Sequence, residues 1–329
     1  MVRSKIVLVL GLMATVTFMP TMGQAETQLK ALSSMRTNLD YTQAFLKLFI
    51  NRANELSGGE LKITLIGGPE VTPARKAAGA LERGVFDILY GPAGYYAGSV
   101  PEAMAIHGST VGPDVLRKNG GFALLDKIWG ERIKAKILAW GISETKYNLF
   151  FKDKPKVTAD ALDLSGMKVR SSPTYKPLLL SLGATPVSIP FSDFYTSLNR
   201  GLVSGSGWPA VGLARTGVGK LMKYKVEPSF FRSNHLIIIN KAKWDSLSDK
   251  AKKALQTAAL EYETGSIAYL NNVQKAENEK LKKLGLETIT LKGKARAAYD
   301  EGGRKALWKI VDERSKNAAQ LRKLLDVKK

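Results

Sequence analysis

The stretch that decides the fold covers residues 166–209 and reads GMKVRSSPTYKPLLLSLGATPVSIPFSDFYTSLNRGLVSGSGWP. Residues 167–170 alternate between apolar and charged side chains like a strand, and residues 185–189 form a second short strand. Between them, residues 175–182 carry apolar side chains at helical spacing. This order predicts a β-α-β unit and therefore an α/β fold.

A second unit of the same kind lies upstream. Residues 60–67 (ELKITLIG) alternate like a strand, and residues 84–91 (GVFDILYG) form an apolar run between glycines. Residues 73–83 lie between them and carry apolar side chains at helical spacing. Two such units predict two similar lobes, and a chain of 329 residues is long enough for both.

The end of the chain is predicted to be helical. Pro228 is the last proline, so no proline interrupts a helix in the final 101 residues. Ser248 is a suitable N-cap, and an apolar stripe of 3.6-residue period follows it. A helix of this length can span two lobes. We expect the lobes to be joined by crossing strands, since no low-complexity linker is visible.

The N-terminus has the layout of a signal peptide. Arg3 and Lys5 precede an apolar run at residues 6–19, and small residues stand before a predicted cut after Ala25. The alternative is a membrane anchor, but the run is shorter than the roughly 20 residues that span a bilayer and stops at Pro20. We therefore expect residues 1–25 to be removed, and a periplasmic protein with no stable membrane insertion after cleavage.

The composition is strongly basic, and we expect most of this charge to be solvated surface and a smaller part to favour anionic partners. Removing residues 1–25 leaves 48 basic and 29 acidic residues, a net charge of +19. The basic residues are dispersed and lack the interleaved aromatic residues that stack on bases, so nucleic acid is not the expected partner. Cysteine is absent, which excludes disulfides and thiolate chemistry.

The sequence contains no recognisable catalytic motif. The two histidines, His107 and His235, are far apart and stand in no metal-binding or triad-like spacing. Neither a GxSxG elbow nor an HExxH helix occurs. We therefore expect a protein that is not an enzyme and needs no cofactor.

The segment 166–209 closely resembles the solute-binding proteins of tripartite ATP-independent periplasmic (TRAP) transporters, the dicarboxylate-binding family. Four parts match in order and spacing: residues 166–170, 182–187, 190–198 and 201–205. The resemblance implies a two-lobed α/β fold with a ligand cleft, crossing strands and a long helix spanning the lobes. It assigns residues 26–145 and 232–273 to the first lobe, and 146–231 and 274–329 to the second.

The resemblance also implies a ligand-binding arginine, which maps onto Arg170. Its planar fork of donors suits a carboxylate, because two parallel charged hydrogen bonds form at once. A second basic residue that some members carry on the crossing strand aligns near Lys146. Trp208 matches the position at which members that bind monocarboxylates or keto acids often have tryptophan, and Phe191 matches the cleft phenylalanine. Further cleft candidates are Tyr90, Tyr95 and Arg232.

Two residues depart from the family pattern. Ser204 stands where aspartate is usual, and Gly207 replaces the acid that metal-using members place before their tryptophan. The expected site therefore has no metal.

The expected function is capture of a small organic anion by hinge closure, favouring a monocarboxylate or keto acid, and delivery to the permease subunits of a TRAP transporter. Two alternatives stay open: an input protein for a sensor kinase, and a periplasmic enzyme acting on a carboxylated substrate.

Overall fold

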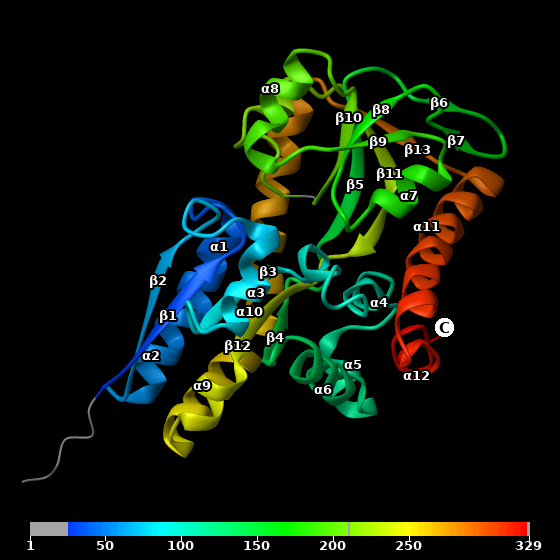
Figure 1. Ribbon diagram of the computed structural model, residues 1–329. Helices are drawn as coiled ribbons and strands as arrows, with labels where there is room; N and C mark the ends of the chain where they lie inside the picture. The colour runs from blue at the N-terminus through cyan, green and yellow to red at the C-terminus, as the bar shows by residue number, and fades with distance from the viewer. Residues whose placement is uncertain (1–25, 210, 328–329) are drawn as a thin grey trace, which may run out of the picture.

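The computed structural model describes residues 26–209 and 211–327, which fold into two lobes with one sheet each (Figure 1). The predicted signal peptide, with its cut after Ala25, lies outside the described residues. No helix in the described part of the chain is long and apolar enough to cross a membrane. The two-lobed α/β fold expected from the sequence is confirmed.

The first lobe is built on a five-stranded sheet in which β1 lies between the two upstream strands that the sequence predicted. Its strands, in spatial order, are β2 (Leu61–Gly67), β1 (Thr27–Ser33), β3 (Ile88–Pro92), β12 (His235–Asn240) and β4 (Ala135–Gly141). β1 pairs in parallel with β2 and β3, and β12 runs antiparallel to β3 and β4. Apolar cores cover both faces of the sheet, so its strands are buried on both sides.

The second lobe is built on a six-stranded sheet that contains the segment from which the fold was predicted. Its strands, in spatial order, are β13 (Glu287–Thr290), β11 (Tyr224–Arg232), β5 (Lys146–Phe151), β10 (Gly205–Pro209), β8 (Lys168–Ser171) and β9 (Thr185–Ser188). A separate hairpin consists of β6 (Lys156–Val157) and β7 (Leu162–Asp163). β10 pairs in parallel with β8, which sets Ser206 beside Arg170.

Helices cover both sheets. Those on the first sheet are α1 (Asp40–Phe45), η1 (Leu46–Ile50), α2 (Asn51–Ser57), α3 (Ala77–Glu82), α4 (Ala103–His107), α5 (Pro113–Asn119), α6 (Gly121–Ile133) and α9 (Lys241–Ser246). The second lobe has α7 (Lys176–Ser181) and α8 (Phe194–Asn199). Short 3₁₀ turns are η2 (Ala74–Lys76), η3 (Ala93–Tyr96), η4 (Phe191–Asp193) and η5 (Val218–Lys220).

The long helix α10 (Asp249–Lys283) passes along both lobes (Figure 1). It begins at the predicted N-cap, where the hydroxyl of Ser248 accepts a hydrogen bond from the Ala251 amide. Tyr262 belongs to a core of the first lobe and Leu281 to a core of the second. Gly141 lets α10 approach β4, since a Cβ there would lie 2.1 Å from the Tyr262 ring.

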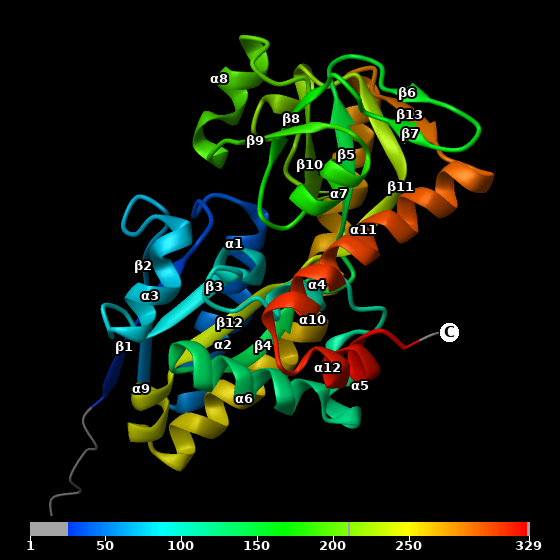
Figure 2. The same cartoon turned by 45° about the vertical axis from the view of Figure 1, so that its right-hand side comes forward.

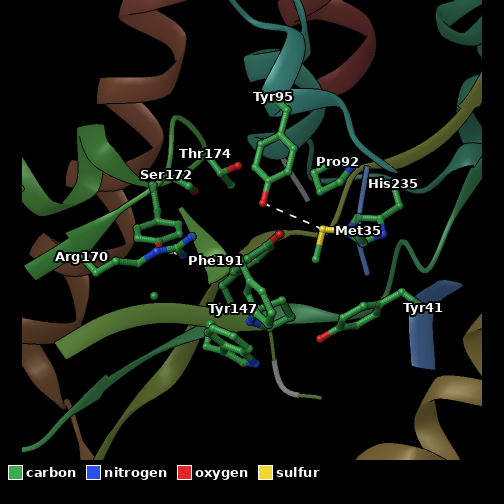
Figure 3. A pocket seen from close by; sticks show the side chains of 14 residues that line it. Met35, Tyr41, Pro92, Tyr95, Tyr147, Arg170, Ser172, Thr174, Phe191 and His235 are labelled. Carbon is green, nitrogen blue, oxygen red and sulfur yellow. Dashed lines mark hydrogen bonds between the residues drawn. The ribbon is translucent and has the colours of Figure 1, made fainter. Parts of the chain in front are cut away.

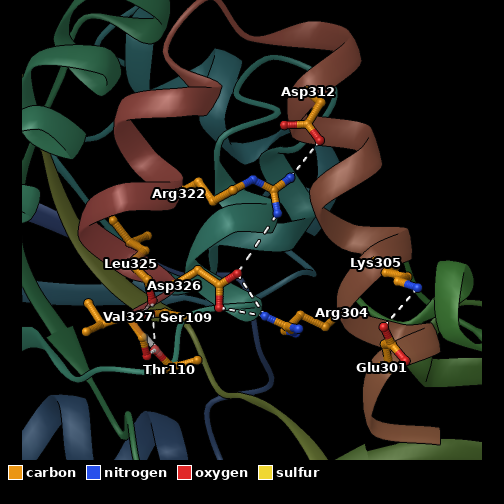
Figure 4. A network of polar contacts seen from close by, with 10 residues as sticks. All are labelled: Ser109, Thr110, Glu301, Arg304, Lys305, Asp312, Arg322, Leu325, Asp326 and Val327. Carbon is orange, nitrogen blue, oxygen red and sulfur yellow. Dashed lines mark hydrogen bonds and ion pairs between the residues drawn. The ribbon is translucent and has the colours of Figure 1, made fainter. Parts of the chain in front are cut away.

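The C-terminal helices α11 (Gly293–Arg314) and α12 (Ala318–Leu325) correct the expected lobe assignment. α11 begins in the second lobe, where Tyr299 joins its core. It ends in the first lobe, whose core contains Trp308 and also Leu321 of α12, and Arg304 of α11 forms an ion pair with Asp326 just after α12 (Figure 4). Residues 307–325 therefore pack with the first lobe, although the sequence placed everything after residue 274 in the second (Figure 2).

Two short segments between the sheets connect the lobes. One links β4 to β5 and the other links β11 to β12, and the Ser233 amide donates to the Thr145 carbonyl between them at 2.8 Å. Ile142 and Phe231, which lie in or beside these links, have φ angles of 49° and 36°. A left-handed backbone is uncommon in bulky and β-branched residues, so both links are strained.

Candidate ligand-binding site

A cavity lies between the lobes, with walls from both of them (Figure 3). Its free space is about 440 Å³ when the open solvent at its mouth is counted, so most of this space is the opening of the cleft. Its lining residues are Met35, Tyr41, Pro92, Tyr95, Tyr147, Arg170, Ser172, Thr174, Tyr175, Phe191, Gly207, Trp208, Pro209 and His235. We call this the inner chamber. None of the described residues that line it is acidic.

Arg170 is the one permanently charged side chain among the described residues that line the inner chamber. It stands on β8 with only 6% of its surface exposed. Its Nε donates to the Ile189 carbonyl at 3.1 Å, and Nη1 donates to the Tyr175 hydroxyl at 2.7 Å. These bonds use two of the five guanidinium donors. The titratable groups that act on Arg170 in the described chain are the neutral phenols of tyrosines, not carboxylates, so its buried charge has no ion-pair partner there.

Trp208 forms an aromatic wall of the chamber. Its ring lies 5.1 Å from that of Phe191 and 5.8 Å from that of Phe194, nearly parallel to the latter. Its indole nitrogen donates to the Val211 carbonyl at 3.2 Å. Packing on one side and a hydrogen bond on the other hold the indole in one orientation.

The packing of Tyr175 against Gly207 explains why this position has no side chain. A Cβ at this position would lie 2.9 Å from ring carbons of Tyr175, which is closer than real Cβ contacts come. Any side chain at 207, including a carboxylate, therefore requires Tyr175 to move away. No group of three or more His, Cys, Asp or Glu side chains suited to a metal ion occurs within the described residues.

Tyr95 approaches the chamber from η3 of the first lobe, opposite the residues of the second lobe (Figure 3). Its hydroxyl lies 3.9 Å from the Met35 sulfur. Burial raises the pKa of Tyr95, while the nearby charges of Arg170 and Arg75 oppose that rise. The phenol therefore stays neutral at physiological pH and can donate a hydrogen bond.

An outer chamber adjoins the inner one and shares Met35, Tyr95, Arg170, Ser172 and Phe191 with it. It is larger, about 1060 Å³ with its open space, and again none of its described lining residues is acidic. Three exposed cations of the first lobe also line it: Arg36, Arg75 and Lys76. The approach to Arg170 is therefore strongly positive.

Lys146 and Arg232 lie elsewhere. Both line a second cavity beside α4 and α11, not the chamber that contains Arg170. Arg232 forms an ion pair with Glu144. The neighbour of Lys146, Tyr147, lines the inner chamber instead, because successive residues of a strand point to opposite sides.

Tyr90 also differs from the expectation, since it is fully buried and does not line the chamber. It stands behind His235, whose Nδ1 lies 3.0 Å from the Tyr90 hydroxyl. Burial lowers the pKa of His235 to about 3, so the imidazole that faces the chamber is neutral.

Comparison with known proteins agrees with this geometry. The model of the family described as bacterial extracellular solute-binding protein, family 7 (DctP), matches residues 130–314. The chain belongs to this family.

Relatives of known name are distant. The C4-dicarboxylate-binding periplasmic protein of Rhodobacter capsulatus is 28% identical over 184 residues, which cover 52% of this chain and 54% of that protein. The monocarboxylate 2-oxoacid-binding periplasmic protein of a Nostoc species is 22% identical, covering 71% of this chain and 65% of that protein. The alignment with the first thus spans about half of its length.

Solved structures show the same fold. A TRAP periplasmic solute-binding protein from Desulfovibrio salexigens, with bound orotic acid, superimposes with a TM-score of 0.80 at 20% identity, covering 91% of this chain and 97% of that one. These family 7 relatives and structural neighbours are solute-binding proteins, not enzymes.

Sequence reasoning found Arg170, Trp208, Phe191 and Tyr95, which the structure brings together in one chamber. It missed Tyr41, Tyr147, Tyr175 and His235. Tyr175 had a usable signal, because it lies five residues after Arg170 inside the family motif. Tyr41 and His235 come from distant parts of the first lobe, and no local pattern marks them.

Proposed function

We propose that this chain is an exported solute-binding protein that captures a small organic carboxylate through Arg170 and delivers it to the membrane permease of a TRAP transporter. The observation that carries the proposal is a buried guanidinium that is hydrogen-bonded to two neutral groups and has no acidic residue among its described neighbours in the chamber. An unpaired buried charge is costly. A carboxylate ligand supplies the missing charge and accepts two parallel hydrogen bonds.

The ligand that we favour has one carboxylate, as in a monocarboxylate or a 2-oxo acid. The described lining of the inner chamber contains one cation, which matches one carboxylate. The Nostoc relative is named for such acids, whereas the Rhodobacter relative is named for C4-dicarboxylates. We further propose that no metal takes part, because Gly207 offers no carboxylate and Tyr175 fills the space beside it.

Capture proceeds by closure of the lobes about the two strained links. Contacts across the cleft support this. Arg75 of the first lobe donates to the Ser188 hydroxyl of the second at 3.1 Å, and Arg215 of the second lobe donates to the Asn38 carbonyl of the first at 2.9 Å. Such bonds form only when the lobes are close together.

We place the mature protein in the periplasm, with a new N-terminus at Glu26. The basic start and apolar run of residues 1–25 support export, and the two relatives above are periplasmic by name. Mass spectrometry of the exported protein tests this directly. A mass that includes residues 1–25 would refute the cleavage site.

A thermal-shift screen of organic acids tests the function. A ligand present at about 100 times its Kd adds roughly 2.7 kcal/mol to the folded state, which is easily measured. We expect a carboxylate to raise the Tm, and the shift to persist with a chelator and in sodium-free buffer. A screen in which neutral sugars raise the Tm and no carboxylate does would refute the proposal.

A further inference from the structure

The inner chamber is unusually rich in aromatic rings. Seven of its fourteen lining residues carry one, so flat apolar surfaces make up much of its wall. We propose that the chamber selects a carboxylate attached to a flat aromatic or heteroaromatic ring. This inference rests on the proposed function, because it assumes that Arg170 binds the carboxylate.

The rings come from both lobes. Phe191 and Trp208 belong to the second lobe, and Tyr95 faces the chamber from the first (Figure 3). Phe191 and Trp208 are tilted by 34° to each other at 5.1 Å, and Phe194 packs behind Trp208. This second layer holds the wall rigid. Closing the lobes then brings aromatic surfaces towards a ligand from two sides, which suits a thin, flat molecule.

Two hydroxyl groups of the chamber are already engaged within the protein. The Tyr175 hydroxyl is engaged with Arg170 and Ser206, and the Tyr41 hydroxyl donates to the Val211 carbonyl. A sugar acid needs a partner for each of its hydroxyls, because a buried hydroxyl without a hydrogen bond is costly. An aromatic ring needs no such partners away from its carboxylate.

A second acidic group on the ligand is also disfavoured. The other cations beside this cleft are Arg36, Arg75 and Lys76, which line the outer chamber and not the inner one. Two of them already contact the opposite lobe. The Arg36 guanidinium lies over the Phe191 ring at 5.3 Å, and Arg75 donates to the Ser188 hydroxyl. Their positions close the mouth of the cleft rather than extend the inner chamber.

Calorimetric titration with three probe acids tests the inference: benzoate, cyclohexanecarboxylate and pyruvate. Benzoate and cyclohexanecarboxylate share a six-carbon ring and one carboxylate, and differ in flatness and in π-electrons. We expect benzoate to bind roughly threefold or more tightly than cyclohexanecarboxylate, since an aromatic pair contributes about 0.5–1.5 kcal/mol beyond its buried area. Pyruvate should bind more weakly than benzoate.

The variant Phe191→Leu removes a ring that is only partly buried, so the protein should remain folded. We expect it to reduce the preference for benzoate over cyclohexanecarboxylate at least twofold. Tyr195→Leu is the matched control, because this ring is exposed on α8 and does not line the chamber. If Phe191→Leu fails to fold, Tyr95→Leu makes the same test on the opposite wall, which the first lobe supplies.

The outcomes separate the two proposals. If cyclohexanecarboxylate or pyruvate binds as tightly as benzoate, or if Phe191→Leu weakens all acids equally, the aromatic preference is wrong while carboxylate capture stands. If a dicarboxylate such as terephthalate binds more tightly than benzoate, the inference that the chamber disfavours a second acidic group is also wrong. If no carboxylate binds, the proposed function itself fails.

Discussion

Nη1 of Arg170 donates to the Tyr175 hydroxyl at 2.7 Å, in a cleft whose described lining contains no carboxylate. Because Tyr175 accepts this bond, its own hydrogen is free for the Ser206 hydroxyl at 3.0 Å, and Ser206 in turn donates to the Gly207 carbonyl at 2.9 Å. The chain of hydrogen bonds runs in one direction and ends on a neutral acceptor. It orients the guanidinium without cancelling its charge.

Tyr175→Phe should therefore affect both stability and binding. The substitution leaves a buried guanidinium donor without its acceptor, and losing a hydrogen bond to a charged group costs about 1.5–3 kcal/mol. We expect a lower Tm without ligand and a weaker affinity for the carboxylate, with a smaller loss than Arg170→Ala causes. Tyr195→Phe, at an exposed position, is the control. An unchanged Tm and Kd would show that Tyr175 does not hold Arg170.

The positive outer chamber should accelerate the capture of anions. Arg36, Arg75 and Lys76 line it without an acidic residue among the described lining, and salt screens such fields over about 10 Å at 0.1 M. We expect the association rate constant to fall severalfold when NaCl rises from about 0.01 M to about 1 M. In the double variant Lys76→Gln and Arg75→Gln the salt dependence should flatten, while Arg83→Gln, which does not line the chamber, should leave it unchanged. Equal salt dependence in all three proteins would contradict the steering role.

The two histidines should make the protein less stable in mild acid. Burial lowers the pKa of His107 to about 4 and that of His235 to about 3, below the usual value near 6.5. At a pH between the folded and unfolded pKa values, the unfolded chain binds protons that the folded chain does not. Each histidine's contribution to the free energy of unfolding is therefore fully present above about pH 6.5 and is lost as the pH falls towards the folded pKa. At about pH 5 the loss is roughly 2 kcal/mol per histidine.

Thermal melts from neutral pH down to about pH 5 measure this effect. Replacing both histidines with glutamine removes every imidazole in the chain, so the fall in Tm over that range should become shallower. A fall that is as steep in the variant as in the parent would assign the acid sensitivity to other groups.

The local motifs predicted much of the site because they lie on neighbouring strands. Arg170 on β8 and Trp208 on β10 belong to one short segment, and the parallel pairing of Ser206 with Arg170 brings them together. Lys146 was predicted for the cleft, but the structure places it in another cavity and its neighbour Tyr147 in the chamber. Residues alternate sides along a strand, so an error of one position exchanges Lys146 for Tyr147 and moves the side chain to another cavity.

The contributions of the first lobe were harder to predict. Tyr41 and His235 of the first lobe line the same chamber as Trp208 of the second, and no short-range pattern encodes such contacts between lobes. The same limit explains the C-terminal helices. The apolar stripe of α11 predicts that one face is buried, but not that its first half contacts the second lobe and its second half the first.

The most direct test of the central claim is calorimetric titration of Arg170→Ala and Arg170→Lys with the carboxylate that stabilises the parent protein most. Truncating one partner of a buried charged pair costs about 2–5 kcal/mol, so Arg170→Ala should weaken binding by well over tenfold, at about 1.4 kcal/mol per tenfold. Lysine keeps the charge without the two-pronged geometry and should fall between. Arg200→Ala, at an exposed position on the same lobe, is the control, and a melt of each variant without ligand verifies folding. If folded Arg170→Ala binds the carboxylate as tightly as the parent, Arg170 does not hold the ligand and the account is wrong.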